Sequence, residues 1–159
     1  MKGSQILITG APMGYRGECT ISGTPKPGTC ITVLAATEPV NGRFTYEAYN
    51  ADADGNQRKV AVLLEDFLQG FAYTRAYVTG ERAFYYEPLP GDELNMLVAD
   101  VSGTGADQDH GIGEVFIIDD GTGKLIATTG TPESEPFVCM ETITDQTADL
   151  WVWCQFTGY

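Results

Sequence analysis

Turn signals divide this chain into short apolar or alternating runs along most of its length. Glycine follows a polar residue at Asn41-Gly42 and at Asp120-Gly121, and such pairs favour a tight turn between two strands. The run at residues 43–49 alternates polar and apolar side chains, as a strand with one solvated face does. Short runs at this regular spacing are typical of sandwiches and barrels.

We therefore predict a mainly β fold, namely a compact β-sandwich or β-barrel-like domain with at most short helices, at residues 63–68 or 92–98. A chain of 159 residues suits one domain with a sizeable core. The predicted strands span residues 30–37, 43–49, 59–65, 71–78, 82–87, 93–100, 114–119, 124–129, 136–142 and 149–156.

Residues 1–28 differ from the rest of the chain, because they hold six glycines and three prolines. Proline removes amide donors and glycine raises the entropic cost of order, so a long helix is excluded here. The apolar side chains of this segment would stay in water unless they docked on another surface. We predict an extended N-terminal arm, residues 1–28, followed by a single β-rich domain, residues 29–159. The residues expected to make the arm's contacts are Ile6, Leu7, Ile8, Tyr15 and Arg16.

The chain is strongly acidic, with 22 acidic residues, nine basic residues and a net charge of −13. Proteins bind nucleic acid largely by neutralising phosphates with lysine and arginine, so no nucleic-acid partner is predicted. Residues 1–43 are the exception, since four basic and two acidic side chains give them a charge of +2 and leave −15 for the remainder. This asymmetry favours an arm that lies on a surface other than its own domain.

Four cysteines, at positions 19, 30, 139 and 154, show no Cys-x-x-Cys spacing, and no apolar leader is recognisable. We expect reduced thiols packed as small hydrophobic side chains, in a protein made in a cytoplasm. The apolar runs are shorter than a membrane-spanning helix requires, so no membrane partner is predicted.

The stretch Gly-Thr-Gly-Lys at residues 121–124 follows an apolar run and superficially resembles a phosphate-binding loop. Such a loop needs a glycine six positions before the lysine and a serine or threonine after it. Here those positions hold Ile118 and Leu125. The run that follows is short and rich in β-branched residues. It therefore cannot supply the helix whose N-terminus would bind a phosphate. We predict a hairpin turn between two strands instead.

Other motifs that could carry chemistry are incomplete. Residues 50–55 imitate the start of a calcium loop, but Ala61 replaces the glutamate of its twelfth position, so a hairpin loop is predicted and weak calcium binding is left open. The single histidine, His110, follows a glycine-rich run that predicts a solvated loop. Acidic pairs such as Glu65-Asp66 leave a carboxylate hydrolase as a distant alternative. We predict no enzymatic activity, no metal and no other cofactor.

The C-terminal run at residues 149–156 predicts a strand that is apolar on both faces, with Trp151 and Trp153 on one side and Val152 on the other. Such a strand is covered by two layers of its own domain, or by one layer and a neighbouring subunit. A stacking platform for sugar rings is a further interpretation, for the tryptophans or for the tyrosine-rich run at residues 82–86. The residues predicted at a subunit or shell interface are Trp151, Trp153, Phe156 and Tyr159.

Several stretches together resemble the head decoration, or cement, proteins of tailed bacteriophages. The likeness runs from about Gly3 to Tyr159 and consists of turns and strand edges. The stretches that carry it are Ile21-Ser22-Gly23-Thr24-Pro25-Lys26-Pro27-Gly28-Thr29, Val60-Ala61-Val62-Leu63-Leu64-Glu65-Asp66, Asp119-Asp120-Gly121-Thr122-Gly123-Lys124-Leu125 and the end Phe156-Thr157-Gly158-Tyr159.

The resemblance implies a structural virion protein that stabilises the mature icosahedral head from its outer surface. It implies binding to the major capsid protein, clustering as trimers, and an N-terminal arm that cross-links neighbouring subunits. Linking several copies raises effective concentration, so individually weak contacts combine into a strong attachment. The alternative from another class is a small β-sandwich that binds glycans as an adhesin on a virion surface.

Overall fold

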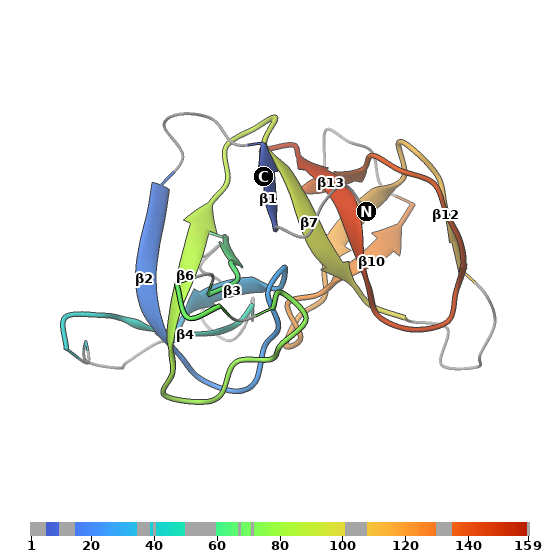
Figure 1. Cartoon of the computed structure of the whole chain (residues 1–159). Coiled ribbons are helices and arrows are strands. Elements are labelled where there is room, and N and C mark those ends of the chain that lie inside the picture. Colours follow the sequence, from blue (N-terminus) through green and yellow to red (C-terminus); the bar gives the residue numbers. More distant parts are fainter. Residues whose placement is uncertain are drawn as a thin grey trace.

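A computed structural model describes residues 6–9, 15–34, 39, 41–49, 60–66, 68–70, 72–100, 108–129 and 135–158. Within these residues the chain is all β, and most of its strands form two closed sheets that lie side by side (Figure 1). The predicted mainly β, barrel-like fold is confirmed. The strands are β1 (Leu7–Thr9), β2 (Tyr15–Ile21), β3 (Cys30–Val33), β4 (Thr45–Ala48), β5 (Ala61–Leu63), β6 (Arg82–Glu87), β7 (Glu93–Val98), β8 (Gln108–His110), β9 (Val115–Ile118), β10 (Leu125–Thr128), β11 (Phe137–Cys139), β12 (Ile143–Gln146) and β13 (Leu150–Phe156).

The first barrel consists of β2, β4, β3, β5 and β6, in that order around the sheet. Strand β2 pairs antiparallel with β6 over residues 15–20, and it pairs in parallel with β4 only at Thr20 and Ile21. Side chains alternate along each strand, so every second residue points inward. The inward side chains form a closed apolar cluster of Cys19, Ile21, Ile31, Tyr46, Ala61, Leu63, Tyr77, Ala83 and Tyr85.

The second barrel is a circuit of β7, β10, β9, β11 and β13, which closes because β13 also pairs antiparallel with β7. Strand β1 adds to the edge of β7, where Leu7 pairs with Leu94. Strands β8 and β12 form a separate two-stranded sheet. Strand β13 lies between β11 and β7. This is the central position expected for a strand that is apolar on both faces.

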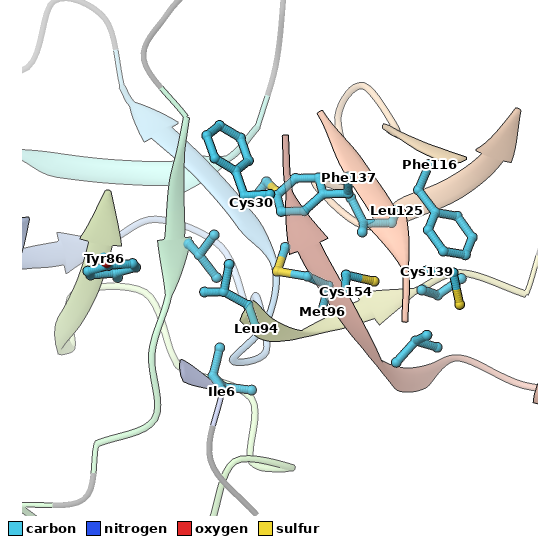
Figure 2. Packing of buried hydrophobic residues seen from close by; sticks show 14 of the residues in the cluster. Ile6, Cys30, Tyr86, Leu94, Met96, Phe116, Leu125, Phe137, Cys139 and Cys154 are labelled. Atoms are coloured by element: carbon cyan, nitrogen blue, oxygen red, sulfur yellow. The ribbon is translucent and has the colours of Figure 1, made fainter. Parts of the chain in front are cut away.

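One core joins the two barrels (Figure 2). It takes Cys30, Val62 and Tyr86 from the first barrel and packs them with Met96 and Phe116 of the second. Burying each large apolar side chain contributes about 1.5–3 kcal/mol relative to leaving it exposed. Because this apolar contact is continuous, we describe the two barrels as one domain. The other members of the shared core are Ile6, Leu64, Leu94, Val98, Leu125, Phe137, Cys139, Val152, Cys154 and Phe156.

The Gly-Thr-Gly-Lys stretch is a hairpin turn, as predicted, since β9 and β10 pair antiparallel from Ile118 and Leu125 onward. The turn also docks on the first barrel. The amide of Cys30 donates to the carbonyl of Gly123 at 2.8 Å, and the amide of Gly121 donates to the carbonyl of Tyr49 at 2.8 Å. The stretch thus acts as a structural link between the two barrels.

The predicted boundary between an arm and a domain at residue 28 is wrong for the described residues. Strand β2 is a full member of the first barrel, and Ile6 is completely buried in the shared core. One of the glycines that suggested an irregular arm has a packing role, because a Cβ at Gly17 would collide with the ring of Tyr85. A strand that contains a glycine can therefore be a core element when a large side chain of the neighbouring strand fills the space beside that glycine.

Two smaller predictions also fail. Residues 72–78 form turns and a loop, whereas a strand was predicted. Tyr77 in this segment is buried. Its amide donates to the carbonyl of Pro25, and its hydroxyl donates to the carbonyl of Leu64. The two candidate helices are absent from the described residues, because 93–98 is strand β7 and the described part of 63–68 is a strand end and a loop. The predicted loop at residues 50–55 lies outside the described residues.

Replacing Tyr86 by phenylalanine is expected to destabilise the junction of the barrels. The buried hydroxyl of Tyr86 donates to Oδ2 of the buried Asp92 at 2.5 Å. Removing one partner of a buried hydrogen bond costs about 1–3 kcal/mol. The Asp92 carboxylate loses one of its donors, although the amide of Leu89 still donates to Oδ2 at 2.8 Å. Urea unfolding measures this loss. Tyr49→Phe is the control, because the half-buried Tyr49 hydroxyl makes no hydrogen bond within the described chain; equal losses in both variants would contradict the prediction.

Candidate functional site

The residues most often used in catalysis serve packing here. His110 is buried, and its two ring nitrogens lie 2.9 Å from Glu114 Oε2 and 2.9 Å from Gln146 Oε1. The ring also meets Phe116 edge-on, with 5.2 Å between the ring centroids. The predicted solvated-loop position of His110 is therefore wrong, because β8 pairs with β12 and carries the ring into the protein.

All four cysteines are free and buried, as predicted. Burial raises the pKa of each thiol, in the case of Cys19 to about 12 with a smaller contribution from Glu18. Thiols with such pKa values stay protonated at neutral pH and are poor nucleophiles. Among the described residues, no three His, Cys, Asp or Glu side chains gather in a way that could hold a metal ion.

The acidic pairs are also structural where the chain is described. The Oε2 atom of Glu65 accepts from the amide of Ile6 at 3.2 Å. Asp66 is buried and accepts from the amide of Gln69 at 3.1 Å. Asp92 is held by Tyr86, as described above. These carboxylates anchor chain segments, and none of the contacts seen here opposes two of them across a pocket.

A groove of about 470 Å³ lies where the linker between β2 and β3 meets the β9–β10 turn. Its charged lining consists of Lys26, Lys124 and Asp149, and Lys124 Nζ lies 2.5 Å from Asp149 Oδ2. The ammonium of Lys26 lies 5.8 Å from the centroid of the Trp151 ring. The groove is thus a polar seam between the barrels whose cations already have partners.

The two tryptophans lie on one face of β13, as predicted, and both are half-buried. The indole nitrogen of Trp151 donates to the carbonyl of Pro27 at 2.8 Å, and the rings of Trp151 and Tyr73 meet in a T-shaped contact. The indole nitrogen of Trp153 donates to Glu93 Oε2 at 3.1 Å. With Lys26 over its face, Trp151 is not an open platform for sugar rings.

The other members of the predicted interface are placed differently. Phe156 points to the opposite side of β13 into the shared core, where it packs against Phe137. Tyr159 lies outside the described residues. In the tyrosine-rich run at residues 82–86, Tyr85 and Tyr86 are both buried, so neither tyrosine offers a stacking surface. The half-buried Phe84 has the guanidinium of Arg82 5.2 Å from its ring centroid.

The predicted arm residues fall into two groups. Ile6 is in the core, while the side chains of Leu7 and Ile8 lie outside what the structure describes. Tyr15 and Arg16, at the start of β2, are both exposed, and Tyr15 keeps 58% of its surface accessible. Among the predicted arm residues whose side chains the structure describes, Tyr15 and Arg16 are the ones that a partner could reach directly.

Tyr15 belongs to a larger apolar feature that sequence reasoning missed. Tyr15 begins β2, Phe44 comes just before β4, and Val33 ends β3. Because β2 and β4 are parallel and β3 is antiparallel to β4, all three lie toward the same end of the first barrel, with Tyr15 four residues beyond the level of Phe44 along β2. Phe44 is 53% exposed. We call Tyr15, Val33 and Phe44 the apolar rim. Behind it, Tyr46 and Tyr85 stack with ring centroids 4.9 Å apart.

No model of a known protein family matches this chain, and no curated protein matches it. The described residues also contain no helix long and apolar enough to cross a membrane. The fold and the apolar rim therefore define the molecule as an all-β two-barrel protein with a candidate interaction surface on its first barrel.

Proposed function

We propose that this protein is a structural component of a phage virion, which decorates the outer surface of the mature head by binding the major capsid protein and stabilises the shell without catalysing a reaction. The proposal starts from the resemblance in the turns and strand edges of the chain. The observation that carries it in the structure is the apolar rim, where Tyr15 and Phe44 are each more than half exposed. Exposed apolar side chains gathered in one region are typical of protein interaction sites.

Two further observations support a binding role. His110 and the four cysteines are buried, and the carboxylates of Glu65, Asp66 and Asp92 anchor chain segments, so these groups serve the scaffold. The two barrels share one core and are linked by the docked β9–β10 turn, which makes a compact body suited to spanning a seam between capsid subunits. Contacts across such seams raise the barrier to subunit separation. Clustering as trimers remains the expectation drawn from the resemblance.

A test of this function has to leave the fold intact. Starting the chain at Thr29 would delete β2 from the first barrel, and replacing Ile6 by serine would disturb the core, so both changes would test folding. Tyr15→Ser with Phe44→Ser instead removes the two aromatic side chains of the apolar rim from the surface. We expect this double variant to bind undecorated mature heads at least tenfold more weakly in co-sedimentation, as loss of two anchoring aromatic side chains predicts.

The matched control removes two exposed apolar side chains elsewhere. Leu68 is 64% exposed and Ile112 is 70% exposed, so Leu68→Ser with Ile112→Ser makes a similar chemical change away from the rim. The control is expected to saturate the heads at the same ratio to capsid subunits as the unmodified chain. Failure of the unmodified chain to bind heads at all would overturn the decoration proposal, and equal binding by both double variants would remove the rim from it.

A further inference from the structure

Among the described residues, strand β2 has an open edge from Tyr15 to Cys19, which is most of its length. It pairs with β6 from Tyr15 to Thr20, but its pairing with β4 begins only at Thr20. In Figure 1, β2 is the outermost strand of the first barrel, on the side away from the second barrel. Edge strands of this kind present unpaired backbone groups that can pair with another strand.

The hydrogen-bond pattern shows which backbone groups face outward. The amide of Ile21 donates to the carbonyl of Glu81, on the β6 side, whereas the amide of Thr20 donates to the carbonyl of Phe44, on the β4 side. Because these directions alternate along an antiparallel strand, the amides and carbonyls of Arg16 and Glu18 also point away from β6. No described residue forms a backbone hydrogen bond with Arg16 or Glu18 on that side.

The side chains at these two positions carry opposite charges. Arg16 is exposed and has no acidic partner among the described residues. Glu18 has a partner in Arg43, whose Nε lies 2.8 Å from Glu18 Oε2, but the Glu18 side chain remains 40% exposed. In a chain with a net charge of −13, an unpartnered arginine beside an open strand edge is a specific feature.

We infer that the open edge of β2 pairs with the same edge of a second copy of this chain, antiparallel and related by a two-fold axis at Gly17. In this register Arg16 of each copy lies opposite Glu18 of the other. The outward amides and carbonyls of these residues then form backbone hydrogen bonds in both directions, and each pair of opposed side chains has complementary charges. The contact is isologous, so it closes as a pair of copies.

The competing registers are less favourable. A shift that centres the contact on Arg16 places two arginines opposite each other, and a shift that centres it on Glu18 places two glutamates opposite each other. Continuing the pairing to Thr20 is blocked, because its amide is already bound to Phe44. At the proposed axis Gly17 has no side chain, and the space on its inner face is filled by Tyr85. Charge complementarity therefore selects one register.

This contact is independent of capsid binding, since it forms in solution between free copies, and it differs from the trimer that the resemblance implies. The test uses two charge variants of the full chain. Arg16→Glu places glutamate opposite Glu18, and Glu18→Arg places arginine opposite Arg16, so each variant alone is expected to pair at least tenfold more weakly. In a mixture of the two, every opposed pair is again one glutamate and one arginine. We expect the mixed pair to form with an affinity near that of the unmodified chain.

Sedimentation velocity and native mass spectrometry measure the outcome, because the two variants differ in mass and a mixed pair is identified directly. Lys26→Glu is the control, since it makes the same change of net charge in the groove and should leave pairing unchanged. Arg16→Pro tests the backbone: the lost amide points outward, so the fold should persist while pairing is lost.

Thermal unfolding of each variant separates loss of pairing from loss of folding, which matters for Glu18→Arg because it also removes the Arg43 contact. A chain that is monomeric up to millimolar concentration would overturn the inference. So would pairs or trimers that persist unchanged in Arg16→Glu, or folded variants that fail to form the mixed pair. In each of these cases the protein could still bind capsids. The pairing inference and the decoration proposal can therefore be overturned independently of each other.

Discussion

Gly123→Ala is expected to lower the free energy of unfolding by about 3 kcal/mol or more. Gly123 has a φ of 66°, which costs a residue with a Cβ about 1–2 kcal/mol. Its added Cβ would also collide with the carbonyl oxygen of Cys30 and lie 2.9 Å from the amide nitrogen of Tyr49. Both are backbone atoms of the first barrel, so relief requires the docked turn to move, and overpacking of this kind costs about 1–3 kcal/mol more. Urea unfolding measures the loss.

The matched control for this substitution lies two residues earlier in the same turn. Gly121 has a φ of 86°, and a Cβ there meets nothing within 4 Å. Gly121→Ala therefore isolates the conformational cost and should lose only about 1–2 kcal/mol. If the two variants were equally stable, the close approach of the turn to the first barrel would not be a stabilising contact, and the account of how the barrels are joined would have to change.

Alkaline pH is expected to unfold the protein steeply. Cys30 and Cys154 are completely buried, and burial raises the pKa of both thiols far above the ordinary value near 9.0. Above that pH the unfolded chain releases these protons while the folded chain retains them. The unfolded state is thereby favoured, and stability that is fully present below about pH 9 falls by about 1.4 kcal/mol per pH unit for each thiol. The two thiols together predict a slope of about 3 kcal/mol per unit.

Urea unfolding at pH 8, 9.5 and 10.5 measures this slope. Cys30→Ala with Cys154→Ala removes both ionising groups, so its stability should depend less steeply on pH even though small cavities lower its absolute value. The remaining dependence is expected to come from the other cysteines and, above pH 10, from Tyr46, Tyr77 and Tyr85, whose pKa values burial raises. Parallel curves for the two chains would show that these thiols are not what limits alkaline stability.

Local patterns predicted a large part of the fold. Strand β6 was expected at residues 82–87 and occurs there, and the turn at Asn41-Gly42 has φ values of 52° and 76°, which those residue types tolerate. Alternating side chains and turn residues act over a few positions, so they can be recognised without knowing the rest of the chain. The two faces of β13 were likewise visible in the order of its residues.

The candidate interaction surface could be predicted only in part. The exposure of Tyr15 and Arg16 agrees with the sequence analysis, but the apolar rim requires Val33 and Phe44 to be brought to the same end of a barrel. Likewise, the open edge of β2 exists only because β4 joins it as late as Thr20. These features depend on which strands pair, and the partners are far apart in the chain.

The amino-acid sequence by itself determined that this protein is built of short strands joined by tight turns, because strand periodicity and left-handed turn positions are set by neighbouring residues. Only the tertiary structure decided that the glycine-rich leading segment is a barrel strand, that His110 is buried and that the Gly-Thr-Gly-Lys turn joins two barrels. A glycine, a histidine or a turn can lie either at the solvent-exposed surface or against a packed neighbour. Which of the two it meets depends on long-range pairing that brings a complementary surface into place, as the ring of Tyr85 does for Gly17.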